Sequence, residues 1–312
     1  MHRYIHIHNF IVIAFTLSLI FISAEKSAVS SQYNGFIIKS PLVPLSQIYH
    51  GGPPRDGIPS IDQPRFIAAH QETYLRDSDR VLGLEGTEQD KAYPVRILNW
   101  HEIINDGDTL ISYCPLCGTG MAFKSVDSNF GVSGLLYNSD MLLYDRETHS
   151  LWSQILGQAI SGKRKGQYLH MLPLQHTSWA NWKENHPDTL VLSENTGFSR
   201  NYNHTPYGNY ATSTSLYFPI DSKDRRYHPK EMVIGLHYKG IYKAYPFIEL
   251  SKMKQASFQD SIAGDKIEVR FNSEHRSGNI YLSTGKPIPS LTSYWFAWYA
   301  FHPTTEVFTY SD

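Results

Sequence analysis

The chain has 312 residues, enough for one large domain or two ordinary ones with full hydrophobic cores. Its formal net charge is −1, so charge gives no reason to expect binding to nucleic acid or to an anionic membrane surface. The 21 tyrosines favour half-buried sheet surfaces and predict abundant β-structure.

The first 24 residues have the pattern of an export signal. Arg3 supplies a positive charge, residues 10–22 are largely apolar, and Ser23 and Ala24 are small residues that a signal peptidase accepts. The apolar run, about thirteen residues, is too short to span a bilayer comfortably. We therefore predict a signal peptide over residues 1–24 and a secreted, periplasmic or other extracytoplasmic protein. An uncleaved N-terminal anchor is the alternative, and it would be the only membrane contact.

The rest of the chain divides by composition. Residues 25–60 are rich in serine, proline and glycine, which predicts an N-terminal segment of turns and loops. Short strands and turns follow, until asparagine, glycine, proline and tyrosine dominate between Thr196 and Tyr210. We predict a first half over residues 61–200, which holds the cysteines, and a second half over residues 201–312.

Two segments of the sequence match one another. Residues 81–94 align without gaps to residues 233–246, and both end in Lys-Ala-Tyr-Pro. A Gly-Asp pair and a candidate strand follow each copy, at residues 107–113 and 264–271. This order predicts an internal repeat. We expect a mainly β (α+β) fold of two related β-rich halves, with short helices between strands.

Cys114 and Cys117 are the only cysteines, and they lie in the motif Cys-Pro-Leu-Cys-Gly. Cys114 follows an alternating run, so it is expected at the end of a strand. The glycines Gly118 and Gly120 oppose a helix, and residues 121–126 have the pattern of a returning strand. We predict a tight hairpin. This argues against a thioredoxin-like fold, in which the two cysteines begin a helix.

Three roles are open for this pair: a structural disulfide, a redox-active dithiol and metal ligation. Outside the cytosol a disulfide is the default state, but so short a loop gains only roughly 2 kcal/mol from closure. The motif is also the turn of zinc-ribbon and rubredoxin knuckles. No second cysteine pair exists, so other side chains must complete a metal site. Met121 is a candidate thioether ligand, and the candidate imidazoles are His149, His170 and His176, among which spacing does not choose. With two thiolates, such ligands would suit copper, and His149 is taken as the predicted ligand.

From Ser112 onward the chain resembles the DUF3179 family, a domain of unknown function. Four segments carry the resemblance, which extends over about residues 60–305: residues 113–123, 130–154, 157–162 and 196–202. The resemblance implies no activity. It does mark the cysteine pair and residues 130–154 as features of a family.

The block over residues 130–154 has the pattern of a hairpin with a turn at Asn138-Ser139-Asp140, followed by a second turn after Asp145. Two roles are open for Asp140 and Asp145, which lie near one turn. Their carboxylates converge, for acid–base chemistry or for a metal, or each aspartate bonds nearby backbone N–H groups, which is the commoner role of aspartates in turns. Further along, Trp179 and Trp182 are predicted core residues of a helix over residues 177–186 that Pro187 ends.

Neighbouring side chains complete the predicted site. Tyr137 and Asn138 are expected to line the same cleft as the two aspartates. Arg146 would clamp an anionic ligand, or instead pair with a neighbouring carboxylate.

We interpret the chain as an exported protein with a thiol site at Cys114 and Cys117, redox-active or metal-binding. The expected cofactor is copper or another transition metal, and otherwise none. The expected partner is a small molecule or a redox partner, and nucleic acid is not expected. The alternative is a binding module in which the cysteine pair is a structural disulfide. In that module four aromatic side chains form a ligand platform: Tyr137, Tyr144, Trp152 and Tyr202.

Overall fold

A computed structural model describes residues 30–311, so the predicted signal segment, residues 1–24, lies outside the described residues. The fold is mainly β, with 40% strand and 12% helix, as predicted. Within the described range, no helix is both long and apolar enough to cross a bilayer.

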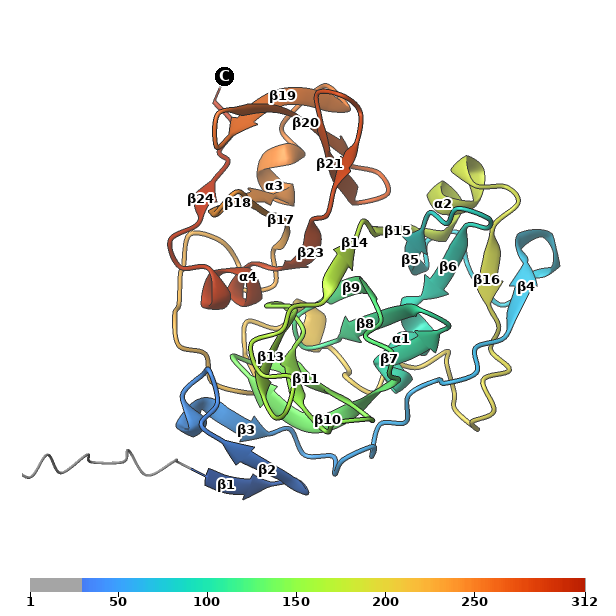
Figure 1. The fold of residues 1–312 in the computed structure, drawn as a ribbon. Coiled ribbons are helices and arrows are strands. Elements are labelled where there is room, and N and C mark those ends of the chain that lie inside the picture. Colours follow the sequence, from blue (N-terminus) through green and yellow to red (C-terminus); the bar gives the residue numbers. More distant parts are fainter. Residues whose placement is uncertain (1–29, 312) are drawn as a thin grey trace, which may run out of the picture.

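The central sheet has eight strands in the order β24-β18-β17-β23-β9-β8-β7, with β14 beside β9 (Figure 1). Its strands are β7 (Ile103–Asp106), β8 (Thr109–Cys114), β9 (Thr119–Lys124), β14 (His170–Leu172), β17 (Met232–Tyr238), β18 (Ile241–Pro246), β23 (Leu291–Tyr294) and β24 (Glu306–Val307). A single pair, Thr292 opposite Gly120, joins β23 to β9. The central sheet therefore takes strands from both sides of the boundary predicted near residue 200.

A five-stranded antiparallel sheet of order β13-β12-β11-β10-β3 carries the second family block. Its strands are β3 (Ile48–His50), β10 (Phe130–Tyr137), β11 (Asp140–Asp145), β12 (Leu151–Ser153) and β13 (Gln158–Ser161). The predicted hairpin and the strand after its second turn are thus confirmed. The N-terminal segment adds β3 to this sheet and forms the hairpin of β1 (Ser30–Tyr33) and β2 (Phe36–Lys39).

Within residues 30–311, two further sheets and seven short helices complete the fold. One sheet has the order β15-β5-β6-β16-β4 and the other the order β19-β20-β21-β22. Their strands are β4 (Phe66–Ala68), β5 (Arg80–Leu84), β6 (Lys91–Pro94), β15 (Gln175–Ser178), β16 (Leu190–Leu192), β19 (Ser257–Ile262), β20 (Asp265–Asn272), β21 (Ser277–Leu282) and β22 (Pro287–Ile288). The helices are α1 (Val95–His101), α2 (Trp179–Asn185), α3 (Phe247–Leu250), α4 (Trp295–Phe301) and the 3-10 turns η1 (Leu45–Gln47), η2 (Ala69–Gln71) and η3 (Tyr210–Thr212).

The two segments that match in sequence occupy corresponding places in the fold. Each forms a hairpin, β5–β6 or β17–β18, that leads into a short helix. Each hairpin pairs antiparallel with a strand that enters another helix (β15 into α2, β23 into α4), and then parallel with a short strand (β16 or β24). The internal repeat itself stays a prediction.

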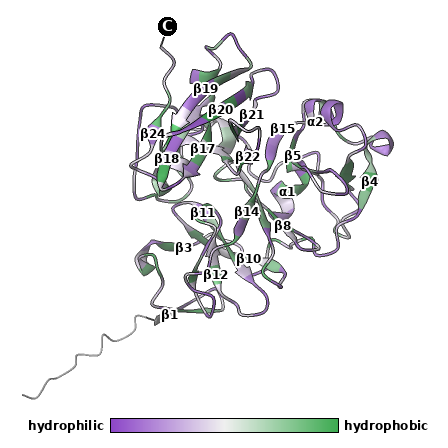
Figure 2. Cartoon of the chain, turned by 45° about the horizontal axis from the view of Figure 1, so that its top comes forward, coloured by the Kyte–Doolittle hydropathy of each residue, from purple (hydrophilic) through white to green (hydrophobic). Residues whose placement is uncertain are grey.

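The predicted helix near residue 180 is confirmed as α2. Most of α2 is coloured hydrophilic in Figure 2, yet Trp179 and Trp182 are fully buried, as predicted. The Oγ of Ser178 caps the helix by accepting from the backbone N–H of Asn181. Two buried tryptophans anchor this helix despite its polar composition, because each ring removes a large area from water.

Strand β8 carries the cysteine motif into the middle of the protein. Successive side chains of a strand point to opposite faces. Leu110 and Cys114 accordingly pack in one hydrophobic cluster, and Ile111 and Tyr113 pack in another. Both faces of the central sheet are therefore covered at this strand, and its C-terminal end is removed from solvent.

Candidate metal centre

The cysteine motif forms the tight hairpin that the sequence predicts. Cys114 ends β8 and pairs with Thr119, the first residue of β9. The N–H of Cys117 donates to the carbonyl of Cys114 at 3.2 Å, which closes the turn. Gly118 has a φ of +61°, a conformation that glycine adopts without steric cost. The two sulfurs are thereby held on one side of a turn, near one another.

A second tight turn brings a carboxylate to the sulfurs. Asn138 and Ser139 have φ angles of +51° and +63°, and Tyr137 pairs directly with Asp140. This is a two-residue hairpin with the backbone of a type I′ turn. The carbonyl of Ser139 accepts from the Sγ of Cys117 at 3.4 Å, and Asp140 follows as the first residue of β11.

Ligand atoms of Cys114, Cys117 and Asp140 all lie within 4.8 Å of one another. The three residues are at most 1% exposed. The Oδ2 of Asp140 accepts from the N–H of Ile155 at 3.1 Å, whereas its Oδ1 is buried without a hydrogen-bond partner among the described residues. Two thiols and a carboxylate oxygen with a free lone pair form a possible metal site.

Burial favours the protonated forms of these three groups. It raises the pKa of the Cys114 thiol, and it raises that of Cys117 well above the usual value, with the neighbouring Cys114 adding to the effect. Burial also raises the pKa of the Asp140 carboxyl to about 7, although the N–H of Ile155 opposes this. A buried charge is costly without a counter-charge, so the neutral forms are favoured until a cation enters.

The two cysteines are free thiols rather than a disulfide. The backbone around them is held by Gln154, a fully buried residue that follows β12. Its Nε2 donates to the Oγ of Ser112 and to the carbonyl of Thr119, at 2.9 and 3.2 Å. The knuckle is therefore kept in place by side-chain hydrogen bonds without a covalent link.

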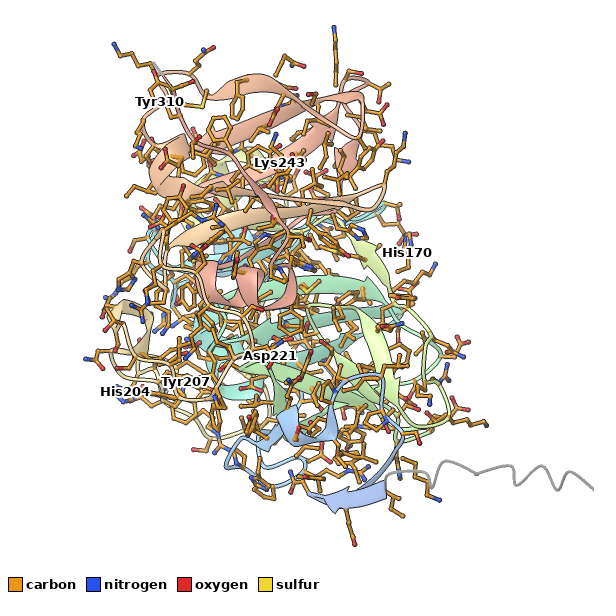
Figure 3. The ribbon with its side chains drawn as sticks, turned by 90° about the vertical axis from the view of Figure 1, so that its left-hand side faces the viewer. His170, His204, Tyr207, Asp221, Lys243 and Tyr310 are labelled. Atoms are coloured by element: carbon orange, nitrogen blue, oxygen red, sulfur yellow. The ribbon has the colours of Figure 1, made fainter. Side chains whose placement is uncertain are left out.

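A covering segment, residues 203–229, lies over the three groups. Tyr210 is 1% exposed and packs in the same cluster as the two cysteines, against which Phe218 also packs. The Oγ of Ser139 donates to the carbonyl of Phe218 at 2.8 Å. Tyr207, labelled with Asp221 in Figure 3, donates through its hydroxyl to Glu102 at 2.8 Å. The covering segment excludes water from the sulfurs.

Three further residues near the sulfurs, Glu102, Tyr207 and Tyr210, were not predicted from the sequence. Burial raises the pKa of the Glu102 carboxyl to about 7, and its charge in turn raises the pKa of the Cys114 thiol. No local pattern points to these residues, because they reach the sulfurs from α1 and from the covering segment. The one signal in the sequence was the richness in asparagine, glycine, proline and tyrosine between residues 196 and 210. It predicted a boundary between the two halves and no contact with the cysteines.

The predicted convergence of Asp140 and Asp145 is wrong. They begin and end the extended strand β11, where five steps separate their Cα atoms by about 17 Å and an odd spacing turns them to opposite faces. Asp145 accepts from the N–H of Thr148 at 2.7 Å and from the Nε1 of Trp152 at 2.9 Å. It therefore takes the alternative role of a turn aspartate. Paired-carboxylate chemistry has no basis here.

The other predicted ligand-binding residues are engaged in structural contacts. Asn138 donates to the carbonyl of Ala300 at 3.3 Å and accepts from the N–H of Asp221 at 2.9 Å. Arg146 pairs with Asp56, with 3.2 Å between the nearest nitrogen and oxygen, as the carboxylate alternative predicts. Tyr137 packs edge-on against Phe301 with ring centroids 5.5 Å apart. Two of the residues predicted for the aromatic platform, Tyr144 and Trp152, are fully buried, so neither offers a surface to a ligand.

The two remaining candidate ligands differ in position. Met121 is 2% exposed and belongs to the same buried cluster as Cys114 and Cys117. His149 is exposed, in the turn after β11, and its ring packs against Tyr144 with centroids 6.3 Å apart. The group of thiol and carboxylate atoms within 4.8 Å does not include His149. Both ligand roles stay predictions, and the arrangement favours Met121.

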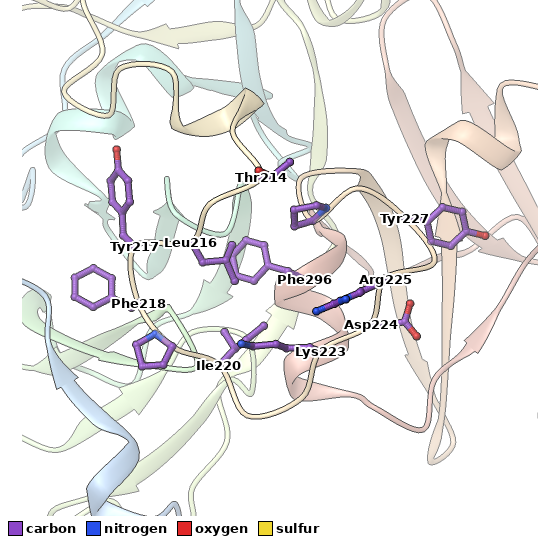
Figure 4. Close-up of a pocket in the computed structure, with 12 residues that line it drawn as sticks. Thr214, Leu216, Tyr217, Phe218, Ile220, Lys223, Asp224, Arg225, Tyr227 and Phe296 are labelled. Carbon is purple, nitrogen blue, oxygen red and sulfur yellow. The ribbon is translucent and has the colours of Figure 1, made fainter.

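A separate cavity of about 640 Å³ is lined mainly by the covering segment (Figure 4). Residues 214–229 form most of its wall, and Phe296 of α4 closes one side. None of the site residues predicted from the sequence lines it. The cavity is accordingly distinct from the thiol–carboxylate group.

The fold and site define a mainly β protein with a buried thiol–carboxylate group at a hairpin knuckle. The sequence matches the family described as "Protein of unknown function (DUF3179)" over residues 55–286. The chain belongs to the DUF3179 family, as the resemblance in residues 113–154 predicts. Comparison with curated proteins and with solved structures finds no match.

Proposed function

We propose that the protein binds a thiophilic transition metal, copper or zinc, through Cys114, Cys117 and Asp140. The observation that carries this proposal is the meeting of two free thiols and an unsatisfied carboxylate oxygen in a site with at most 1% exposure. A core of this size does not need such a group for packing. A buried polar atom without a partner costs free energy, and a bound cation would remove that cost.

The ligand types support copper or zinc over calcium or magnesium. Thiolates are soft ligands and favour Cu(I) and Zn(II), whereas calcium and magnesium prefer oxygen. With both thiolates and the Asp140 carboxylate ionised, Zn(II) leaves one net negative charge and Cu(I) leaves two. Met121 is the proposed source of a further, thioether ligand.

Thiol–disulfide exchange is less well supported. The attacking species in exchange is a thiolate, and reactive cysteines lie in partly exposed, electropositive surroundings. Burial instead raises the pKa of both thiols here, and the covering segment restricts access by a protein partner. The structural-disulfide alternative gains no support from a pair of free thiols.

The test is metal binding by the reduced full-length protein under anaerobic conditions. Wild type should bind one Cu(I) or Zn(II) in competition with a chelator, and C114S/C117S should bind none. Asp140→Asn should weaken binding at least about tenfold, equivalent to about 1.4 kcal/mol.

Asp145→Asn is the matched control, because Asp145 is an equally buried aspartate at the other end of β11. It should lower the free energy of unfolding but leave metal affinity unchanged. The proposal fails if reduced wild type binds no metal, or if the two aspartate variants weaken binding equally.

Export is a further proposal, resting on the sequence pattern of residues 1–24 alone. Mass spectrometry of protein purified from the export compartment should find a mature N-terminus near Glu25. An intact N-terminus in a membrane fraction would favour the anchor instead.

A further inference from the structure

Another pocket, of about 250 Å³, lies beside the cysteine hairpin, where Gly118 and Tyr294 form part of its wall. Strands β5 and β15 and the turn between β20 and β21 form a further part of the wall, and β15 packs against both β5 and β21. The apolar part of the lining comes from Ala211, Met232 and Phe247. The polar side chains that line it are Arg80, Tyr113, His176, Lys230, Arg276 and Tyr294. We call it the basic pocket.

Three cations meet in the basic pocket without an acidic partner. Within residues 30–311 no carboxylate forms an ion pair with Arg80, Lys230 or Arg276. Burial, aided by the neighbouring Arg276, lowers the pKa of Arg80 to about 10. No carboxylate therefore compensates the positive charge, which is unusual for a buried cation such as Lys230, 6% exposed.

Two of the cations are held in place by backbone carbonyls. Arg80 donates to the carbonyls of His176 and Arg276 at 2.8 and 3.0 Å. Lys230 donates to the carbonyl of Ser215 at 2.9 Å and lies 3.5 Å from the centre of the Tyr210 ring. Arg276 is exposed, and its guanidinium carbon lies 5.6 Å from the centre of the Phe247 ring. Three cations held by neutral groups suit an anion better than a neutral ligand.

His176 gives an independent sign of a ligand. It is 6% exposed and lines the pocket, and its Nδ1 has no hydrogen-bond partner among the described residues. Burial and the charge of Arg80 hold its pKa well below the usual value, so the ring is neutral. A neutral imidazole carries one N–H, which can donate to an oxyanion.

We propose that the basic pocket binds a phosphate-type dianion, as the free ion or as the head of a small ester. A monocarboxylate would neutralise only one of three positive charges, whereas a dianion with several acceptor oxygens can satisfy the guanidinium, the ammonium and the imidazole together. The volume is below the roughly 300–1,000 Å³ of pockets for drug-sized ligands, so the occupant is small. This inference does not rest on the metal proposal.

The test is calorimetric titration of the full-length protein at constant ionic strength with inorganic phosphate, glycerol 3-phosphate and acetate. Phosphate or its ester should bind and acetate should not. Tighter binding of the ester than of the free ion would identify an ester as the ligand, and the reverse would identify free phosphate. Binding of acetate alone, or of none of the three, overturns the proposal.

Arg276→Gln should weaken phosphate binding at least tenfold, because it removes one of the three positive charges. The side chain is exposed, so its replacement should leave the core intact. Arg270→Gln is the matched control: Arg270 lies on the adjacent strand β20, pairs with Glu268 and does not line the pocket. Equal effects of the two variants would overturn the proposal. Metal content should be unchanged in Arg276→Gln, which separates this site from the thiol–carboxylate group.

Discussion

Individual side chains around the sulfurs gain their properties from burial. Asp140 and Glu102 both have carboxyl pKa values raised to about 7 by desolvation, and the thiols are shifted in the same direction. Glu102 accepts a hydrogen bond from Tyr207, which lowers its pKa but does not outweigh burial. Burial thus favours the neutral forms of these acids, and pH should alter the stability of the protein.

Glu102→Gln tests this at the level of one residue. The folded protein holds a proton on Glu102 that the unfolded chain has lost above a pKa of 4.5. The free energy of unfolding should therefore fall as pH rises from about 4.5 to about 7. Glutamine mimics the protonated acid, so E102Q should remove about 3 kcal/mol of that fall. Urea denaturation of metal-free protein at pH 5 and pH 8 measures it.

The control for this experiment is Glu184→Gln, which removes an exposed carboxylate on α2. It should keep the pH dependence of wild type. An unchanged pH dependence in E102Q would contradict the assignment of a raised pKa to Glu102.

At the level of elements, two tight turns build the site. The sequence predicts both turns. Gly118 and the apolar strand pattern after it predict the cysteine hairpin, and Asn138-Ser139 between two apolar runs predicts the second hairpin. These are local features, set by which residues tolerate positive φ. Which side chains the two turns bring together is not local, because β8–β9 and β10–β11 belong to different sheets.

Gly118→Ala should show how far the site depends on the first turn. Gly118 has a φ of +61°, and an added Cβ would lie 2.8 Å from the Tyr294 ring. We expect a loss of about 2–4 kcal/mol in the free energy of unfolding, from backbone strain and overpacking together, and weaker metal binding. Chemical denaturation and metal competition measure the two effects.

Gly107→Ala separates the cost of backbone strain from the cost of overpacking. Gly107 has nearly the same φ, +62°, but an added Cβ would meet nothing within 4 Å. Gly107→Ala should lower the free energy of unfolding only by the cost of backbone strain, about 1 kcal/mol, and should leave metal affinity unchanged. Equal losses in the two variants would show that the Tyr294 contact is unimportant.

At the level of the whole molecule, two units of corresponding topology flank the cysteine hairpin. In each unit a glycine lies under a tryptophan: Gly83 under Trp182 of α2, and Gly235 under Trp298 of α4. Each tryptophan donates through Nε1 to a threonine seven residues later, at 2.9 Å in both cases. The second pair of helices extends the correspondence beyond the segments that sequence analysis aligned, although common descent stays a prediction.

Gly83→Ala and Gly235→Ala should therefore have similar effects. In each, the new Cβ would lie 2.2 Å from the tryptophan Cε3, so the helix must shift. We expect each to lower the free energy of unfolding by about 1–3 kcal/mol, measured by thermal or chemical denaturation. Trp182→Phe should recover part of the loss in Gly83→Ala but not in Gly235→Ala. A negligible cost at only one of the two glycines would contradict the correspondence.

The sequence by itself determined the local elements: the β-rich character, the hairpin at Cys114 and Cys117, the turn at Asn138 and the helix at Trp179. Each depends on backbone preferences and periodicity over a few residues. Only the tertiary structure decided that Asp140 meets the sulfurs while Asp145 does not, that the covering segment excludes water, and that three cations share one pocket. These contacts depend on how segments that are distant in the sequence pack together. Burial sets the charge states of the site, and burial arises only when those segments have packed.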